Sequence, residues 1–554
     1  MKKNIIPFFL ICPFVLSCDY LDTKYDMDIT TEMVESDYTK VAQIGQSVYA
    51  YVKSGLWELD GNLSAARSDE AVQTTPGLTV SLYNNGSWDD LTNPENYLYD
   101  EFYKGIRNAN YFLEYSADYK ELLLVNRDTI SDGGKEYRRD IDNIRWMRAE
   151  ARVARAYYYF ELQKRYGGVP LVTNSLADNE FFPKSPYDRI TDYIVSEIDG
   201  SIDSLRLTWQ NSYGTVEGDK TRDGRFTVGA ALALKSRALL YAASPLNNPE
   251  GDREKWKDAA NAAYEVISMN QYSLDDSYSD LFVGAAALGS PEIIMAYRHS
   301  PENTLEKNNY PIGTPGGNSG ITPSENLVSA YEYVGEHDSG SSRYENLDPR
   351  FYATIVYNGC EWNGRTIDIS KNGQDSYLNN QSSKTGYYLK KFMAPNLYLQ
   401  QDEMERHIWP IFRYAEVLLN YAEAMNEAFG PDGLNGKSLS AKDALNMVRS
   451  RPGVNMPLVT TSDKDEFRKA VRHERQIELA FEGHRYWDLV RWKEGDVLSE
   501  DILGVRVSDD VSPVGYEKIV VEKRVFTVPK MYRYPFPYYE VQRSNGILEQ
   551  NPGW

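Results

Sequence analysis

Cysteine, positive charge and catalytic motifs are scarce in this 554-residue sequence. Its three cysteines are too few for a disulfide framework or a cysteine zinc cluster. Lys and Arg number 60 against 81 acidic residues, a formal net charge of −21 that disfavours nucleic acid as a partner. The segment HERQI, from His473, lacks the second histidine of a zinc protease, and no GxSxG motif occurs. Paired carboxylates remain possible because acidic residues are plentiful.

The N-terminus contains the longest apolar run of the leader, Ile5 to Leu16, which is too short to cross a bilayer. Two lysines precede it, and a small residue followed by Cys18 ends it, so residues 1–17 read as a lipoprotein signal peptide. Cys12 is the alternative but follows a bulky isoleucine. Acylation of Cys18 with more than one chain would anchor the protein, since a single chain binds membranes only marginally. Cys360 would then be the only other cysteine, so we expect no intramolecular disulfide.

No Ser/Gly/Pro-rich linker divides the remainder, which predicts one unit over 18–554. Within it we distinguish an N-terminal part (about 19–272), a loop-rich part (about 273–409) and a C-terminal helical part (about 410–554). The expected fold class is mainly α, with long loops and a few short β-strands or hairpins packed on one side.

Three Ala-rich segments with aromatic rings are each followed by a turn and a second helical pattern. Small residues allow close approach of two helices while rings fill the gaps, as in tetratricopeptide pairs. An early pair, Glu35 to Lys53 with Asn96 to Tyr115, would make the fourth unit. The first helices contain Arg155–Tyr159, Arg237–Ala243 and Glu416–Ala422, and the second helices are Ser185–Leu205, Lys255–Met269 and Ala441–Arg449.

The stretch HERQIELAFEGHRYWDLVRW, His473 to Trp492, is predicted as one amphipathic helix with charges spaced three or four residues apart. Gly483 within it indicates a close backbone approach or a local bend. We interpret the stretch as scaffold, and His473 and His484 as structural residues.

Two regions are rich in Gly, Asn and Ser: Gly55 to Pro94, and Tyr272 to Trp409. Loops of this length inside a compact domain are more often functional than filler. Short extended pieces such as Glu292 to Tyr297 and Ala353 to Tyr357 interrupt the second region. A hairpin is expected in the tail, at Lys518 to Val528.

Aromatic residues beside polar partners in these loops predict a carbohydrate site, because sugars expose apolar C–H faces ringed by hydroxyls. Tyrosine is abundant, with 43 residues against 18 Phe. Trp88 is the first candidate for a stacking ring, since Asn, Gly, Ser and Asp surround it. Trp57, beside Leu56 and Leu59, is expected in the core. The candidate ligand-binding residues are Trp88, Tyr83, Arg67, Asp69, Tyr310 and Trp362.

Five segments in order resemble the SusD/RagB family of surface lipoproteins. Together they span most of the chain. They are the leader ending at Cys18 with Asp-Tyr-Leu-Asp after it, Arg155–Thr173, Ile411–Ala428, His473–Trp492 and Tyr534–Trp554.

The resemblance implies a protein attached to the outer membrane by a lipid on Cys18 and facing the cell exterior. It implies four tetratricopeptide-like pairs, capture of an oligosaccharide, and a role as lid of a SusC-like TonB-dependent transporter. No catalytic residue, cofactor or metal is expected. Peptide uptake, as in the RagB branch, is the alternative, and a surface glycoside hydrolase is a third possibility.

Overall fold

The computed structural model describes residues 37–125, 127–175, 180–209, 224–337, 341–508 and 515–554. The predicted signal peptide and Cys18 lie outside the described residues, as does the start of the first expected helix. None of the helices in the described ranges combines the length and the apolar character that a membrane crossing requires.

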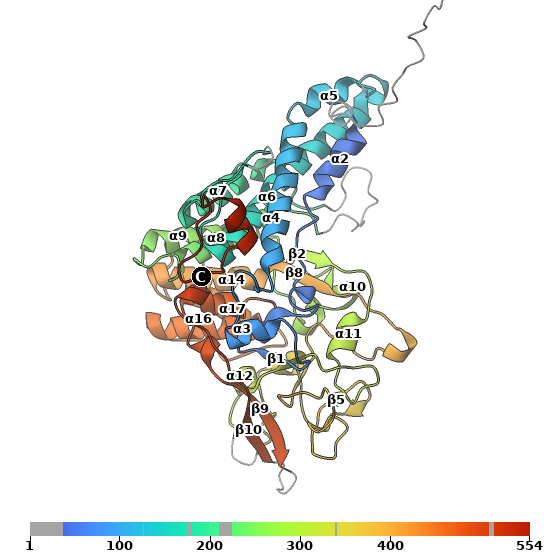
Figure 1. Cartoon of the computed structure of the whole chain (residues 1–554), viewed down its shortest axis with the longest axis vertical. Helices are drawn as coiled ribbons and strands as arrows, with labels where there is room; N and C mark the ends of the chain where they lie inside the picture. The colour runs from blue at the N-terminus through green and yellow to red at the C-terminus, as the bar shows by residue number, and fades with distance from the viewer. Residues whose placement is uncertain (1–36, 126, 176–179, 210–223, 338–340, 509–514) are drawn as a thin grey trace, which may run out of the picture.

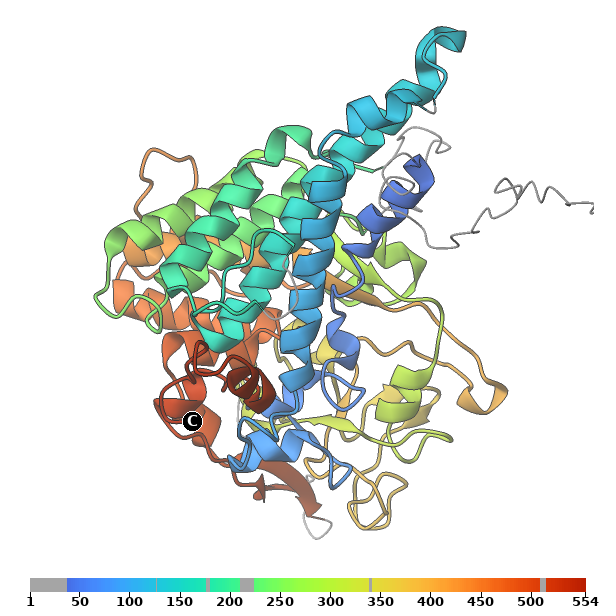
Figure 2. The same ribbon diagram turned by 45° about the horizontal axis from the view of Figure 1, so that its top comes forward.

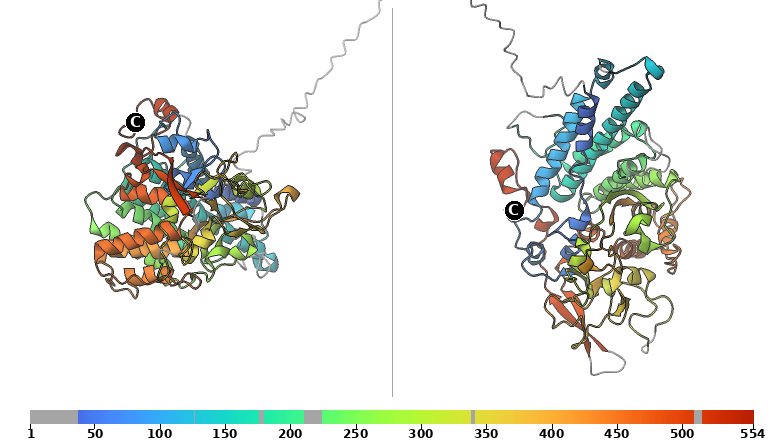
Figure 3. Two further views of the ribbon diagram at one scale, coloured as in Figure 1. Left: turned by 90° about the horizontal axis from the view of Figure 1, so that it is seen from below. Right: turned by 90° about the vertical axis from the view of Figure 1, so that its right-hand side faces the viewer.

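Helices pack in pairs along one side of the molecule, which confirms the mainly α prediction (Figures 1 and 3). Each predicted pair is present, and its two helices contact one another. The pairs are α2 (Tyr38–Ser47) with α4 (Asn96–Tyr115), α6 (Lys135–Tyr166) with α7 (Tyr187–Asp199), α8 (Val228–Ala243) with α9 (Arg253–Ser268), and α14 (Tyr414–Phe429) with α15 (Ala441–Arg449).

Small residues set the distance between these helices. A Cβ at Gly105 on α4 would lie 2.4 Å from the ring of Tyr158 on α6, so only glycine permits this approach. Helix α8 is Ala-rich and buried along most of its length against α9. Side chains that accept hydrogen bonds from backbone N–H groups fix the helix starts: Thr227 begins α8, and Ser440 with Asp443 forms a capping box at α15.

The loop-rich part lies below the helical layer in Figure 1, and the strands in and around it form antiparallel two-stranded sheets. In one of them β1 joins β3, with Ala71 opposite Pro323, so the two long loop regions are paired to each other. The sheets are β1 (Ala71–Gln73) with β3 (Ile321–Pro323), β2 (Ile293–Arg298) with β8 (Ile408–Arg413), β4 (Ile355–Val356) with β7 (Tyr388–Leu389), β5 (Glu361–Trp362) with β6 (Arg365–Thr366), and β9 (Ile502–Ser508) with β10 (Gly515–Glu522).

Short helices connect these pieces. One of them, α3, falls within the first region predicted as loop, and the C-terminal segment lies beside it (Figure 2). The short α-helices are α3 (Val80–Asn85), α5 (Tyr119–Val125), α10 (Gly284–Ala287), α11 (Thr304–Asn309), α12 (Glu325–Val328), α13 (Pro349–Thr354) and α18 (Tyr538–Arg543).

Two sequence predictions about local structure were wrong. The tail hairpin is formed by β9 and β10, so it begins upstream of the predicted Lys518–Val528. The stretch His473–Trp492 is two helices, α16 (Lys464–Glu478) and α17 (Arg485–Trp492). Between them Phe481 and Gly483 have φ of +64° and +75°, left-handed values that a continuous helix cannot contain.

The charges of this stretch mostly bind to other segments of the chain and not to one another. Glu478 accepts hydrogen bonds from three buried arginines on other segments, and Glu482 accepts from Lys391 and from one of those arginines, Arg413. Arg485 pairs with Asp69 of the first loop region. Among the predicted pairs of charges three or four residues apart in this stretch, Asp488 and Arg491 form an ion pair at 2.9 Å.

Candidate functional site

All six side chains predicted to bind ligand are buried. Trp88 is 2% exposed, because rings from the far end of the chain cover it: Trp554 at 4.5 Å and Tyr534 at 5.0 Å between centroids. Tyr83 packs edge-on against Trp88, and its hydroxyl donates to Asn93 at 2.6 Å. The expectation that Trp88 presents an exposed face was therefore wrong.

The other four predicted residues fall into separate clusters. Arg67 pairs with Glu95 at 2.8 Å, and Asp69 accepts two 2.8 Å hydrogen bonds from Arg485. Tyr310 and Trp362 form an edge-to-face pair with centroids 5.9 Å apart. The structure thus brings Trp88, Tyr83 and Arg67 near one another but collects the six around no common opening. Their role in ligand binding remains an untested prediction.

A different opening, which we call the central cavity, lies where the two loop regions meet the helical layer. Its volume is about 310 Å³, at the lower end of the ~300–1,000 Å³ typical of ligand pockets. Loop residues 50–58, helices α4, α6 and α8, strands β2 and β8, and the turn before α17 form its wall. Its lining residues include Lys53, Ser54, Gly55, Trp57, Glu58, Tyr97, Glu161, Lys164, Arg165, Arg237, Tyr297, His299, Trp409, Glu482, Gly483, His484 and Trp487.

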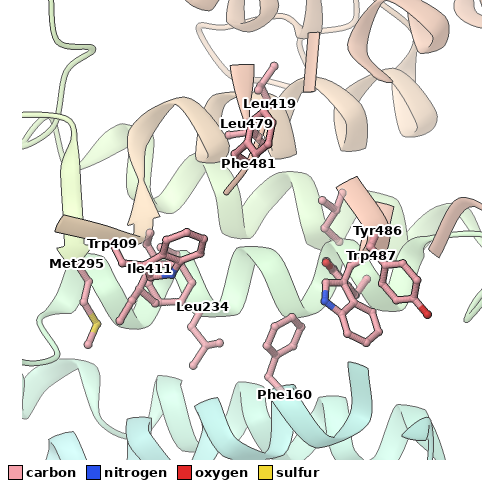
Figure 4. Packing of buried hydrophobic residues seen from close by; sticks show 14 of the residues in the cluster. Phe160, Leu234, Met295, Trp409, Ile411, Leu419, Leu479, Phe481, Tyr486 and Trp487 are labelled. Carbon is pink, nitrogen blue, oxygen red and sulfur yellow. The ribbon is translucent and has the colours of Figure 1, made fainter. Parts of the chain in front are cut away.

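Five of the aromatic rings that line the central cavity lie at different depths. Tyr97 and Tyr297 are 49% and 38% exposed and stand at the rim, whereas Trp409 and Trp487 are 8% and 3% exposed and lie inside. Trp57 is half-buried between these levels. In Figure 4, Trp409 lies on the strand side and Trp487 on the side of α17. The rings at the rim therefore have exposed faces, whereas protein atoms cover most of the surface of the inner rings.

Several rings inside the cavity have polar groups that form no hydrogen bond with the protein. Among the described residues, the indole N–H groups of Trp57, Trp409 and Trp487 donate to no protein acceptor, and the His484 imidazole has no hydrogen-bond partner. Burial, together with nearby arginines, lowers the pKa of His484 well below its ordinary value, so this ring is neutral. A neutral imidazole both donates and accepts, as a sugar hydroxyl does.

The His299 side chain contacts three other residues of the cavity wall. Its Nε2 lies 2.7 Å from the Ser54 hydroxyl, and its ring packs beside Trp57 and Tyr297. Burial lowers the pKa of His299. The hydrogen bond to Ser54 and the contact with Trp57 thus join the segment around these two residues to the end of β2.

The inner wall depends on close backbone approach and on a left-handed turn. A Cβ at Gly55 would lie 2.1 Å from the Trp409 ring, so Gly55 allows the loop to sit on that ring. On the opposite side, the buried Glu70 carboxylate accepts a 3.0 Å hydrogen bond from the Phe481 N–H. This bond holds the left-handed turn that carries His484 into the wall.

One group of histidine and acidic side chains in the described ranges is compact enough to share a cation: Glu302, Glu306 and His407. The His407 Nε2 lies 2.8 Å from Glu306, and its Nδ1 lies 3.2 Å from Glu302. Burial alone would lower the pKa of His407, but the two carboxylates outweigh it and raise the pKa to about 9. Because the carboxylates face opposite ring nitrogens, the arrangement suits a protonated imidazole better than a shared metal ion.

The sequence interpretation missed most of this cavity. It treated His484 as structural, placed Trp57 in the core and did not single out Tyr97, Tyr297 or Trp409 as site residues. One available signal was that Trp57 and Trp409 lie in or at the boundary of the two long loop regions. Trp487 and His484 could not be placed, since the left-handed turn between the helices decides where they point.

Comparisons with known proteins agree with the architecture. The model of the SusD family matches residues 291–554, and a model described as starch-binding associating with outer membrane matches residues 19–240. SusD-like protein P38 of Formosa agariphila is 26% identical over 392 residues, covering 67% of this chain and 71% of that protein.

Solved structures extend the likeness to nearly the whole chain. A SusD-like protein of Bacteroides fragilis has a TM-score of 0.76 at 26% identity, covering 95% of this chain and 99% of the other. A laminarin binding SusD-like protein has a TM-score of 0.62 at 22% identity, covering 93% and 99%, and at that identity it shows the shared fold alone.

Proposed function

Because this chain belongs to the SusD/RagB family, we propose that it captures an oligosaccharide in the central cavity and works as the lid of a SusC-like TonB-dependent transporter. Cys18 would carry the lipid that holds it on the outer face of the outer membrane. Support for carbohydrate as the ligand comes from relatives: one family model is described as starch-binding, and a structural neighbour as laminarin binding.

The main support for the proposal is that the central cavity is lined both by aromatic rings and by polar groups that have no hydrogen-bond partner in the protein. Tyr97 and Tyr297 offer faces on which the apolar side of a sugar can stack, and Trp57 lies just inside them. The free indole N–H groups and the His484 ring then meet hydroxyls deeper in the cavity. With about 310 Å³ available, the cavity takes the end or a short section of a glycan chain.

Two of the three carboxylates that line the cavity, Glu161 and Glu482, favour binding over catalysis. A glycoside hydrolase needs one carboxyl group that is protonated and able to donate. Burial alone would raise the pKa of Glu161, but Lys164 and Arg165 hold it at about 2. Arg413 and Lys391 likewise lower the pKa of Glu482. Both groups therefore stay ionised and fully engaged, and neither can act as the acid.

The lid role requires moderate affinity, since the ligand must pass on to the barrel. Exposed rim rings give sequence-tolerant contacts that form and break easily, and the inner donors add selectivity for hydroxyl positions. We place the hand-over at the rim of the central cavity, where the rings are exposed.

Substitution of the two tryptophans tests the proposal. Trp57→Ala should weaken glycan binding by about 1–3 kcal/mol, by analogy with ring stacking on other flat ligands. Trp88→Ala, a matched change at a ring outside the cavity, should leave the affinity of the folded protein unchanged. Affinity gels and isothermal titration with a panel of glycans and peptides provide the readout. Binding of peptides alone would favour peptide uptake, and release of reducing ends would favour a hydrolase.

A further inference from the structure

Four cationic side chains line the central cavity, and each is already paired with a carboxylate. The Lys164 ammonium lies 2.7 Å from Glu161, and the Arg237 guanidinium contacts Glu416 at 2.6 Å. Lys53 at the rim pairs with Glu101 of α4. Neither Glu101 nor Glu416 lines the cavity itself.

Arg165 is the most heavily engaged of the four. It lies 2.6 Å from Glu161, 3.1 Å from Glu95 and 3.4 Å from Glu58. Three carboxylates therefore surround Arg165 and neutralise the charge that could otherwise attract an anionic ligand. A carboxylate therefore neutralises each of the four cations in the cavity wall.

The carboxylates of the wall make the environment unfavourable for a second anion. Glu58, Glu161 and Glu482 all line the cavity. A carboxylate or sulfate entering it would have to displace one of them from its arginine or lysine, which leaves a buried charge without a partner. The net charge of −21 adds repulsion at longer range.

The groups that remain free are neutral. They are the three indole N–H groups, the neutral His484 ring and the exposed rim tyrosines. Building on the function proposed above, we infer that the central cavity selects neutral glycans and rejects glycans that carry carboxylate or sulfate groups. A neutral sugar uses each of these contacts without breaking an ion pair.

The test compares neutral polysaccharides with their own carboxymethylated derivatives in affinity gels, so that backbone and linkage stay constant. The wild-type protein should bind the derivative at least about tenfold more weakly than its parent. Binding to the neutral parent should also be insensitive to salt, because no ion pair forms.

A change at the rim sharpens the test. Glu101→Gln frees Lys53, and it should raise affinity for the carboxymethylated derivative at least about fivefold. Asp100→Asn is the matched control: it removes the same charge one residue away, but its partner Lys104 at 2.5 Å lies outside the cavity wall. It should leave the affinity for the derivative unchanged, and melting curves of both variants verify folding.

The outcomes separate the two proposals. Equal or tighter binding of the derivative by the wild type, lost in Trp57→Ala, would overturn the neutral selectivity and leave glycan capture intact. An equal gain in Glu101→Gln and Asp100→Asn would also overturn it, because the effect would then come from net charge. If neither polysaccharide binds, glycan capture is wrong and the selectivity inference falls with it.

Discussion

Replacing Glu70 by Gln should change how the stability of the protein depends on pH. Glu70 lies just before β1, is 2% exposed and accepts the hydrogen bond from the Phe481 N–H. Burial raises the pKa of Glu70 from 4.5 to about 8, and the neighbouring Asp69 adds to the effect. Gln keeps the acceptor for Phe481 and is neutral at every pH.

The direction in which stability changes with pH follows from proton linkage. The folded state holds the proton of Glu70 more tightly than the unfolded state, so its stabilisation is complete below about pH 4.5 and is lost as the pH rises toward 8. Within that window the loss is about 1.4 kcal/mol per pH unit, or about 2.7 kcal/mol between pH 5 and pH 7. For a chain of this length that corresponds to a fall of roughly 2 °C in Tm.

Denaturant and thermal unfolding of both proteins at pH 5, 6, 7 and 8 provide the assay. The two should have nearly equal stability at pH 5, and the variant should gain on the wild type as the pH rises. Taking the difference between the two proteins removes the contribution of all other titrating groups. Parallel pH profiles would show that Glu70 titrates normally and refute the reasoning.

Three further predictions follow from packing, charge and the leader. Trp88→Ala should lower the free energy of unfolding by about 3–5 kcal/mol, measured by denaturant unfolding, because the ring is enclosed by Tyr534 and Trp554. Glu478→Ala should cost about 3–5 kcal/mol since it leaves three buried arginines without a shared partner, while ligand affinity of the folded fraction stays normal; lost affinity at an unchanged Tm would contradict the scaffold role. Cys18→Ala should abolish lipid labelling and release the protein from the membrane fraction, and unchanged labelling would reject this cysteine as the anchor.

The helical scaffold could be predicted from the sequence because its signals are local. The bounds of α4 and α15 agree with the predicted ones, since helical periodicity and, at α15, capping residues mark them. Three of the four pairs also join α-helices that follow one another in the sequence, and α2 with α4 is the exception. Small residues at helix contacts, such as Gly105, are visible in the sequence as well.

The candidate site could not be predicted because distant segments decide which rings are covered. Trp88 has polar neighbours in sequence but is covered by Tyr534 and Trp554. Trp57 shows the opposite: Leu56 and Leu59 are buried beside it, which leaves its ring at the cavity. The hydrophobicity of sequence neighbours therefore predicted the wrong order of exposure for the two tryptophans.

The cover over Trp88 also constrains the order in which the chain can fold. Its ring lies in the first loop region, yet the residues that enclose it, Tyr534 and Trp554, follow far later in the sequence and are synthesised long after it. Contacts between such distant positions form late, because a large loop must close first. Until then an apolar surface near α3 stays open and prone to association. The chain should consequently be most prone to aggregate before Tyr534 and Trp554 have packed onto Trp88.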